Sequence, residues 1–138
     1  MVPIEYWGIV FDARTVMKLM RKFQQHIPDG WTVWAHHVTL THVSDEREDV
    51  QDELDLRLGE HVPVRLVSLG ISDEAVALGV TVSGVPCLRA LPHLTLATAP
   101  GVGAVKSNAI TRWVPLSKQA NVADGLIKGA ITAVPYET

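Results

Sequence analysis

Hydrophobic positions near the start of the chain first alternate and then recur at helical spacing. Ile4 to Phe11 alternates between Pro3 and Asp12, which predicts a strand. Asp12 is a suitable N-cap for a helix, which we expect to end near residues 28–30 (Pro-Asp-Gly). The apolar positions of this helix fall at i, i+3, i+4 and i+7: Val16, Leu19, Met20 and Phe23.

The middle of the chain predicts a second strand and a second helix. Thr32 to Val43 is rich in β-branched and aromatic residues, which favours a strand. Glu46 to Leu58 places Val50, Leu54 and Leu58 at four-residue steps among charged residues, which indicates an amphipathic helix with a solvated acidic face.

The pattern over the rest of the chain predicts strands and a loop, without a further helix. A hairpin turning at residues 72–74 is followed by a further strand, a Gly/Pro-punctuated loop over residues 99–108 and two closing strands. The predicted strands are Val64 to Ile71, Ala75 to Val82, Leu91 to Ala97, Thr111 to Leu116 and Leu126 to Val134. Hairpin connections and few helices indicate an α+β fold with a mainly antiparallel sheet, and the even composition predicts one domain over residues 1–138.

Composition changes this prediction little, but the distribution of charge limits the ligand class. The 138 residues carry a net charge of −3, and Ser44 to Glu60 alone holds eight acidic and two basic residues. Elsewhere 7 of the 15 acidic and 10 of the 12 basic residues remain, a net charge of +3. A compact anionic ligand is therefore allowed away from the acidic segment, whereas a long nucleic-acid duplex, which needs a continuous basic stripe, is not favoured.

Cysteine content and targeting signals indicate an intracellular protein. The single cysteine, Cys87, excludes an internal disulfide and a multi-cysteine metal site, and we interpret it as a small buried hydrophobe. No apolar run approaches the ~20 residues that span a bilayer, and the N-terminus lacks the features of a secretory signal. We therefore expect a cytoplasmic protein that does not enter a membrane.

A four-residue motif occurs twice, as HVTL at His37 and as HLTL at His93, 56 residues apart. Side chains alternate along a strand, so each histidine shares a face with the threonine two positions later, while the apolar residues point into the core. If the two strands are neighbours, two imidazoles and two hydroxyls, those of Thr39 and Thr95, converge in one groove.

This set of groups suits the hydrolysis of a cyclic phosphate. One imidazole can be neutral and accept a proton from water while the other is charged and donates a proton to the departing ribose oxygen. The threonine hydroxyls can donate to the non-bridging oxygens, and the scheme requires neither a metal nor a cofactor. The alternative is a pair of half-buried histidines hydrogen-bonded to neighbouring threonines.

His36 and His42 raise the question of a zinc site with His37. Both lie an odd number of positions from His37, so regular alternation places them on the opposite face of the strand. Three zinc ligands must converge on one point, and we therefore expect no metal site here.

Several further residues are candidates for contact with a nucleotide. Tyr6 and Gly8 face away from the core side of the first strand, so Tyr6 either stacks or hydrogen-bonds in the cleft or is a surface tyrosine. Residues 106–108 (Lys106, Ser107, Asn108) follow the second motif and either contact phosphate or base or form a solvent loop. Trp113 and Trp34 are core residues or stacking platforms.

The paired motifs resemble those of the 2H phosphoesterase superfamily, and within it the cyclic phosphodiesterase domain of fungal and plant tRNA ligases and small stand-alone relatives. The resemblance extends to YWGIVFD at residues 6–12, PHLTLATAPG with its following KSN, and WVPL at residues 113–116. It implies a bilobal fold of two antiparallel sheets around a cleft, with helices outside. It also implies that His37 and His93 are the acid–base pair and that Thr39 and Thr95 hold the phosphate.

The implied activity is metal-independent opening of a 2′,3′-cyclic phosphate on RNA or a nucleotide, leaving a 2′-phosphate, as in RNA repair and tRNA processing. Two alternatives share the same site. One is a hydrolase of cyclic oligonucleotide signals, and the other is a catalytically silent module that binds nucleotides without turnover.

Overall fold

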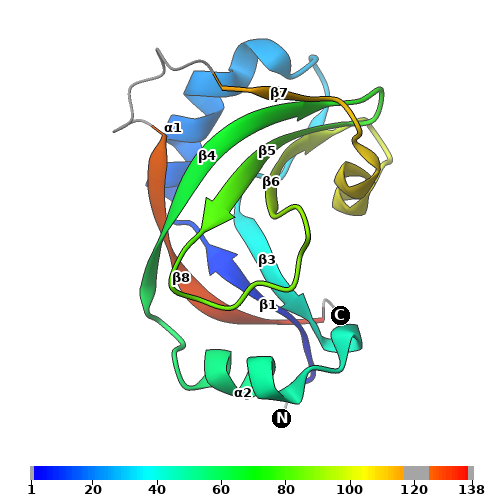
Figure 1. Cartoon of the computed structure of the whole chain (residues 1–138). Helices are drawn as coiled ribbons and strands as arrows, with labels where there is room; N and C mark the ends of the chain where they lie inside the picture. Colours follow the sequence, from blue (N-terminus) through cyan, green and yellow to red (C-terminus); the bar gives the residue numbers. More distant parts are fainter. Residues whose placement is uncertain (1, 117–124, 137–138) are drawn as a thin grey trace.

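The computed structural model of the chain describes residues 2–116 and 125–136, and it has an α+β fold (Figure 1). The helices are α1 (Ala13–Phe23) and α2 (Glu48–Asp55), with short 3₁₀ helices η1 (Gln24–His26), η2 (Val43–Asp45) and η3 (Ala104–Ala109). The strands are β1 (Ile4–Val10), β2 (Thr32–Val33), β3 (His37–His42), β4 (His61–Ile71), β5 (Ala75–Val82), β6 (His93–Thr98), β7 (Trp113–Pro115) and β8 (Leu126–Pro135). The predicted α+β class is confirmed.

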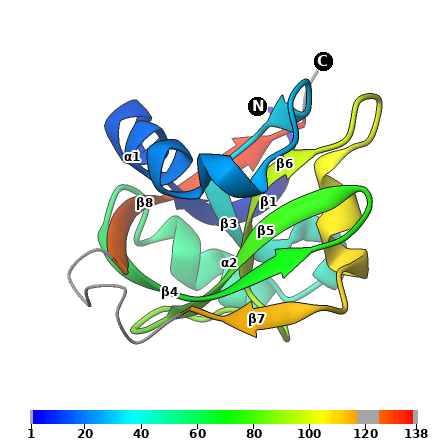
Figure 2. The same cartoon turned by 90° about the horizontal axis from the view of Figure 1, so that it is seen from above.

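The described strands form one antiparallel sheet that closes on itself, instead of the two separate sheets that the resemblance implied (Figure 2). The order β6-β3-β1-β8-β4-β5 returns to β6, because β5 and β6 also pair with each other. The short strands β2 and β7 add to β6 and β4. The pairing of β3 with β6 is limited to Val38 opposite Leu94, so the ring is held by few hydrogen bonds where the two motifs meet.

The two helices differ in how well their bounds follow the sequence pattern. The α1 helix begins where predicted, because the Asp12 carboxylate accepts a hydrogen bond from the backbone N–H of Thr15 at 2.8 Å. The α2 helix is shorter than the predicted range 46–58, because Glu46 has a left-handed φ of 53° and the chain forms a turn over residues 56–59 that ends at Gly59 with a φ of 87°. No helix in the described part of the chain combines the length and apolar character needed to cross a membrane.

The predicted strand over Thr32 to Val43 is wrong as a single element. Ala35 has a positive φ of 48°, which separates β2 from β3. Further along, Trp7 pairs with Thr41 and Gly8 with Thr39, so Leu40 is an extra residue opposite β1 and forms a bulge. The bulge shifts the alternation of side chains by one residue. As a result, Leu40 and Thr41 are both buried, and His42 returns to the face of His37.

The remaining predictions agree more closely with the structure. Strands β4 and β5 form the expected hairpin, and β8 covers the predicted last strand. The predicted loop over 99–108 contains most of η3, which carries Ser107 to the start of β6. Before β6, residues 91 and 92 remain outside the strand.

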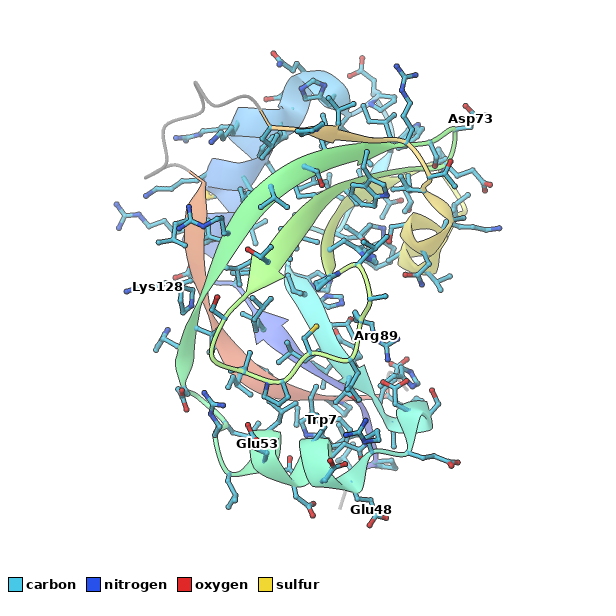
Figure 3. The ribbon with its side chains drawn as sticks, viewed as in Figure 1. Trp7, Glu48, Glu53, Asp73, Arg89 and Lys128 are labelled. Carbon is cyan, nitrogen blue, oxygen red and sulfur yellow. The ribbon has the colours of Figure 1, made fainter. Side chains whose placement is uncertain are left out.

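The core lies inside the closed sheet and supports the motif strands from behind. Val38 and Leu40 of β3 and Leu94 and Leu96 of β6 are fully buried, as the alternation predicted. Full burial of each such side chain stabilises the fold by roughly 1.5–3 kcal/mol. Trp7 of β1 belongs to the same core, and its Nε1 donates to the Asp55 carboxylate at 2.7 Å, which attaches α2 to β1. In Figure 3, Glu48 points outward from α2, away from Arg89.

Candidate active site

The two motifs meet in one pocket with a volume of about 390 Å³. Strands β3 and β6 pair next to each other, and His37, Thr39, His93 and Thr95 all line the pocket, which confirms the predicted convergence. The remaining lining residues come from β1, the bend before β3, the end of β3, the segment before β6 and η3: Glu5, Tyr6, Trp34, His36, His42, Arg89, Ala104, Val105, Ser107 and Asn108.

His37 lies between two rings. Its Nδ1 is 2.7 Å from Nδ1 of His36, and the two imidazoles are stacked with centroids 4.5 Å apart. The Tyr6 ring lies 4.8 Å from the His37 ring on centroids. Burial, followed by the nearby charges of His36 and His93, lowers the pKa of His37 from 6.5 to about 4. His37 is therefore neutral near pH 7.

His93 is held through both ring nitrogens. Nδ1 donates to the carbonyl oxygen of Leu91 at 3.1 Å, since a carbonyl can only accept. Nε2 lies 2.8 Å from Oγ of Ser107. These two contacts fix the orientation of the ring at the start of β6.

Ser107 joins the second histidine to the second threonine. It is 2% exposed, and its hydroxyl donates to the Ala104 carbonyl at 2.9 Å and lies 2.7 Å from Oγ1 of Thr95. Because the single hydroxyl proton of Ser107 goes to Ala104, both Thr95 and Nε2 of His93 act as donors to Ser107. With Nδ1 also donating, this arrangement fits the doubly protonated, cationic form of His93.

The two threonines differ in their hydrogen bonding. Thr95 is buried and engaged with Ser107. Thr39 is half-buried, and its hydroxyl makes no hydrogen bond to the described residues. Thr39 thus has a hydroxyl ready to donate into the pocket.

His36 and His42 line the same pocket as His37, so the prediction that they lie on the opposite face of the strand is wrong. The bend at Ala35 puts His36 beside His37, and the Leu40 bulge returns His42 to the pocket. His42 accepts from the Ser44 backbone at 3.1 Å and lies 3.7 Å from the Glu5 carboxylate. The described residues nevertheless contain no group of three His, Cys, Asp or Glu side chains that could hold a metal ion. In the sequence, the sign that could have indicated this contact between imidazoles is that His36 and His37 are consecutive residues.

The weaker candidates have different outcomes. Tyr6 lines the pocket, whereas Lys106 is exposed and does not line it. Ser107 is a buried partner of the motif residues, not a solvent-loop residue. Trp113 lies outside this pocket, although its ring is 6.4 Å from that of His93. Trp34 lines the pocket and donates through Nε1 to Thr98 at 2.9 Å.

Three other residues lie close to the site: Gly8, Cys87 and Arg89. Gly8 leaves room for the neighbouring strand, since a Cβ there would lie 2.6 Å from the Val38 carbonyl oxygen. Cys87 is half-buried, with Sγ 3.9 Å from the Thr39 carbonyl, and burial raises the pKa of its thiol. Arg89 was not a candidate, yet it borders the pocket and forms an ion pair with Asp45.

Comparison with known proteins shows the fold of the chain. No family model and no curated protein matches the sequence. A crystal structure of a fungal RNA kinase is similar over 97% of this chain, with a TM-score of 0.68 and 15% identical residues. The similarity covers 46% of the kinase chain, so this chain spans less than half the length of that protein. At this identity the two proteins are shown to share a fold.

Proposed function

We propose that residues 1–138 form a 2H phosphoesterase domain that opens 2′,3′-cyclic phosphates on RNA ends or nucleotides without a metal. The observation that carries this proposal is the unequal state of the two motif histidines in one pocket. His37 is neutral near pH 7, and the hydrogen bonds of His93 fit its cationic form. A general base and a general acid are thus available together.

In the proposed reaction, His37 accepts a proton from the attacking water while the oxygen of that water forms a bond to phosphorus. The bond between phosphorus and O3′ of the ribose breaks, and His93 donates its Nε2 proton to O3′. The product carries a 2′-phosphate. His36 is the proposed positioning residue for the base, because accepting the Nδ1 proton of His37 would leave Nε2 unprotonated.

The threonines are proposed to hold the non-bridging oxygens of the phosphate. Thr39 donates directly, and Thr95 exchanges Ser107 for a phosphate oxygen. The net charge of +3 outside residues 44–60 supports an anionic substrate. An RNA substrate is supported by the fold shared with the fungal RNA kinase.

Phosphorus NMR of the product from a 2′,3′-cyclic nucleotide, with EDTA present, tests this proposal. We expect a 2′-phosphomonoester and a rate unaffected by EDTA. His37→Ala and His93→Ala should each lower turnover ~10²–10⁴-fold, whereas His61→Ala, at an exposed position at the start of β4, serves as the matched control.

Two outcomes would contradict the proposal. Activity on cyclic dinucleotides alone would favour a signal hydrolase, and binding without turnover would favour a silent nucleotide-binding module. Near-native turnover in either motif variant would remove that histidine from the mechanism.

A further inference from the structure

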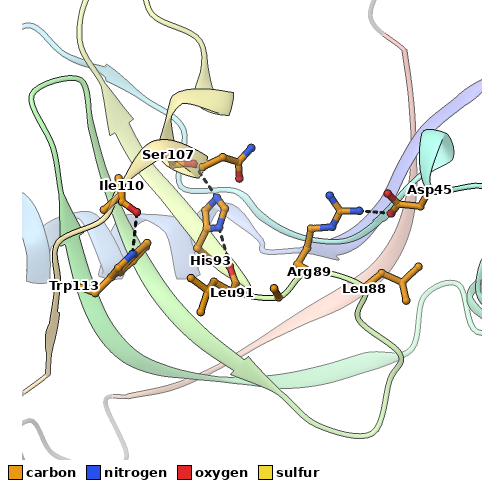
Figure 4. Close-up of a pocket in the computed structure, with 10 residues that line it drawn as sticks. Asp45, Leu88, Arg89, Leu91, His93, Ser107, Ile110 and Trp113 are labelled. Carbon is orange, nitrogen blue, oxygen red and sulfur yellow. Dashed lines mark hydrogen bonds and ion pairs between the residues drawn. The ribbon is translucent and has the colours of Figure 1, made fainter.

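A second cavity adjoins the candidate active site on the other side of His93 (Figure 4). We call it the Trp113 pocket; its volume is about 440 Å³. It is lined by Asp45, Leu88, Arg89, Ala90, Leu91, His93, Ser107, Asn108, Ile110 and Trp113. Arg89, His93, Ser107 and Asn108 border both cavities, so the two form one extended binding surface with a proposed catalytic histidine between its halves.

One wall of the Trp113 pocket is apolar although the core does not require it to be. Leu91 lines the pocket and is 69% exposed, so its side chain is accessible to a ligand. The Trp113 ring is held in place, because Nε1 donates to the Ile110 carbonyl at 3.2 Å and the ring lies flush on Gly70, where a Cβ would approach it to 2.5 Å. A fixed indole and an exposed leucine suit the flat apolar face of a nucleobase.

The opposite end of the Trp113 pocket offers hydrogen-bond donors. In the view of Figure 4, His93 lies between Trp113 and Arg89. Arg89 pairs with Asp45 through Nη2, and its buried Nε has no hydrogen-bond partner among the described residues. The side-chain amide of Asn108 likewise makes no hydrogen bond within the described part of the chain. The Asn108 amide and the part of the Arg89 guanidinium that borders the pocket suit a phosphate oxygen, whereas the buried Nε of Arg89 does not reach one.

On the basis of the function proposed above, we propose that the Trp113 pocket binds the nucleotide that precedes the reacting one. Its base lies against Leu91 and Trp113, and the phosphate that links it to the terminal nucleotide lies near Arg89. The substrate class that fits both halves of the site is an oligonucleotide end of at least two nucleotides.

The test compares a dinucleotide ending in a 2′,3′-cyclic phosphate with the corresponding cyclic mononucleotide. Contact of one base with an aromatic side chain changes binding by about five- to a hundredfold, so we expect kcat/KM to be at least about fivefold higher for the dinucleotide. Leu91→Ala removes the aliphatic contact of the base and leaves Trp113 in place, so this ratio should fall in the variant. The matched control is Leu56→Ala, because Leu56 is also a solvent-exposed leucine (89% exposed) but lies at the end of α2.

Failure of this inference can be distinguished from failure of the proposed function. Turnover of the mononucleotide with a ratio near one in the wild-type protein would overturn the inference and leave the function intact. If neither compound is turned over, the proposed function fails, and calorimetric Kd values for the same two compounds still decide the inference. Equal Kd values, or an advantage of the dinucleotide that is undiminished in Leu91→Ala, would overturn it.

Discussion

Lowering the pH from 7 to 5 should destabilise this protein through His37. A pKa lowered from 6.5 to about 4 means that the unfolded chain takes up a proton in this range that the folded chain does not. The stability that the fold has with neutral His37 is therefore fully present above about pH 6.5. It decreases as the pH falls below this value, and the loss is complete by about pH 4. Carboxylates titrate near pH 4, so their effect is small between pH 7 and pH 5.

The size of this effect follows from the two pKa values. At pH 5 the difference corresponds to about 2 kcal/mol of lost stability, compared with about 0.2 kcal/mol at pH 7. Because His37 lines a pocket open to water and is only partly buried, screening reduces this value. We therefore expect His37 to account for about 1–2 kcal/mol of the loss between pH 7 and pH 5.

Urea denaturation at both pH values, in the wild-type protein and in His37→Gln, measures this contribution. The glutamine does not titrate, so the variant should lose about 1–2 kcal/mol less free energy of unfolding than the wild type between the two pH values. His61→Gln replaces an exposed histidine and should keep the wild-type pH dependence. An equal loss in wild type and His37→Gln would refute the environment assigned to this ring.

Two further predictions concern the groups behind the pocket. Ser107→Ala should lower kcat about tenfold or more with little change in KM, because Nε2 of His93 loses the hydroxyl that holds its ring in place. Exposed Ser83→Ala is the control, and an unchanged kcat would leave Ser107 with a packing role only. Gly8→Ala should lower the free energy of unfolding by about 1–3 kcal/mol in urea denaturation, because the new Cβ would meet the Val38 carbonyl oxygen. Gly103→Ala, which has open space, should be near neutral, and equal stabilities of the two variants would contradict this account.

Local sequence pattern was enough to predict which side chains share a face within a regular strand. His37 with Thr39, and His93 with Thr95, follow directly from the two-residue period, as do the buried Leu40 and Leu94 behind them. The α1 helix was predictable for the same local reason, since its cap and its apolar spacing both lie within one short segment.

The positions at which the regular pattern stops depend on contacts between segments that are distant in the sequence. The positive φ of Ala35 and the bulge at Leu40 depend on pairing with β1 and β6, strands distant in sequence, and they bring His36 and His42 into the pocket. The closed sheet likewise depends on β6 pairing at both edges.

The electrostatic difference between the two histidines was also decided in three dimensions. Both motifs read alike in sequence, yet burial beside His36 lowers the pKa of His37, whereas η3 brings Ser107 to His93. A local pattern specifies the direction of a side chain, but the protons it holds depend on desolvation and on hydrogen-bond partners supplied by other parts of the fold.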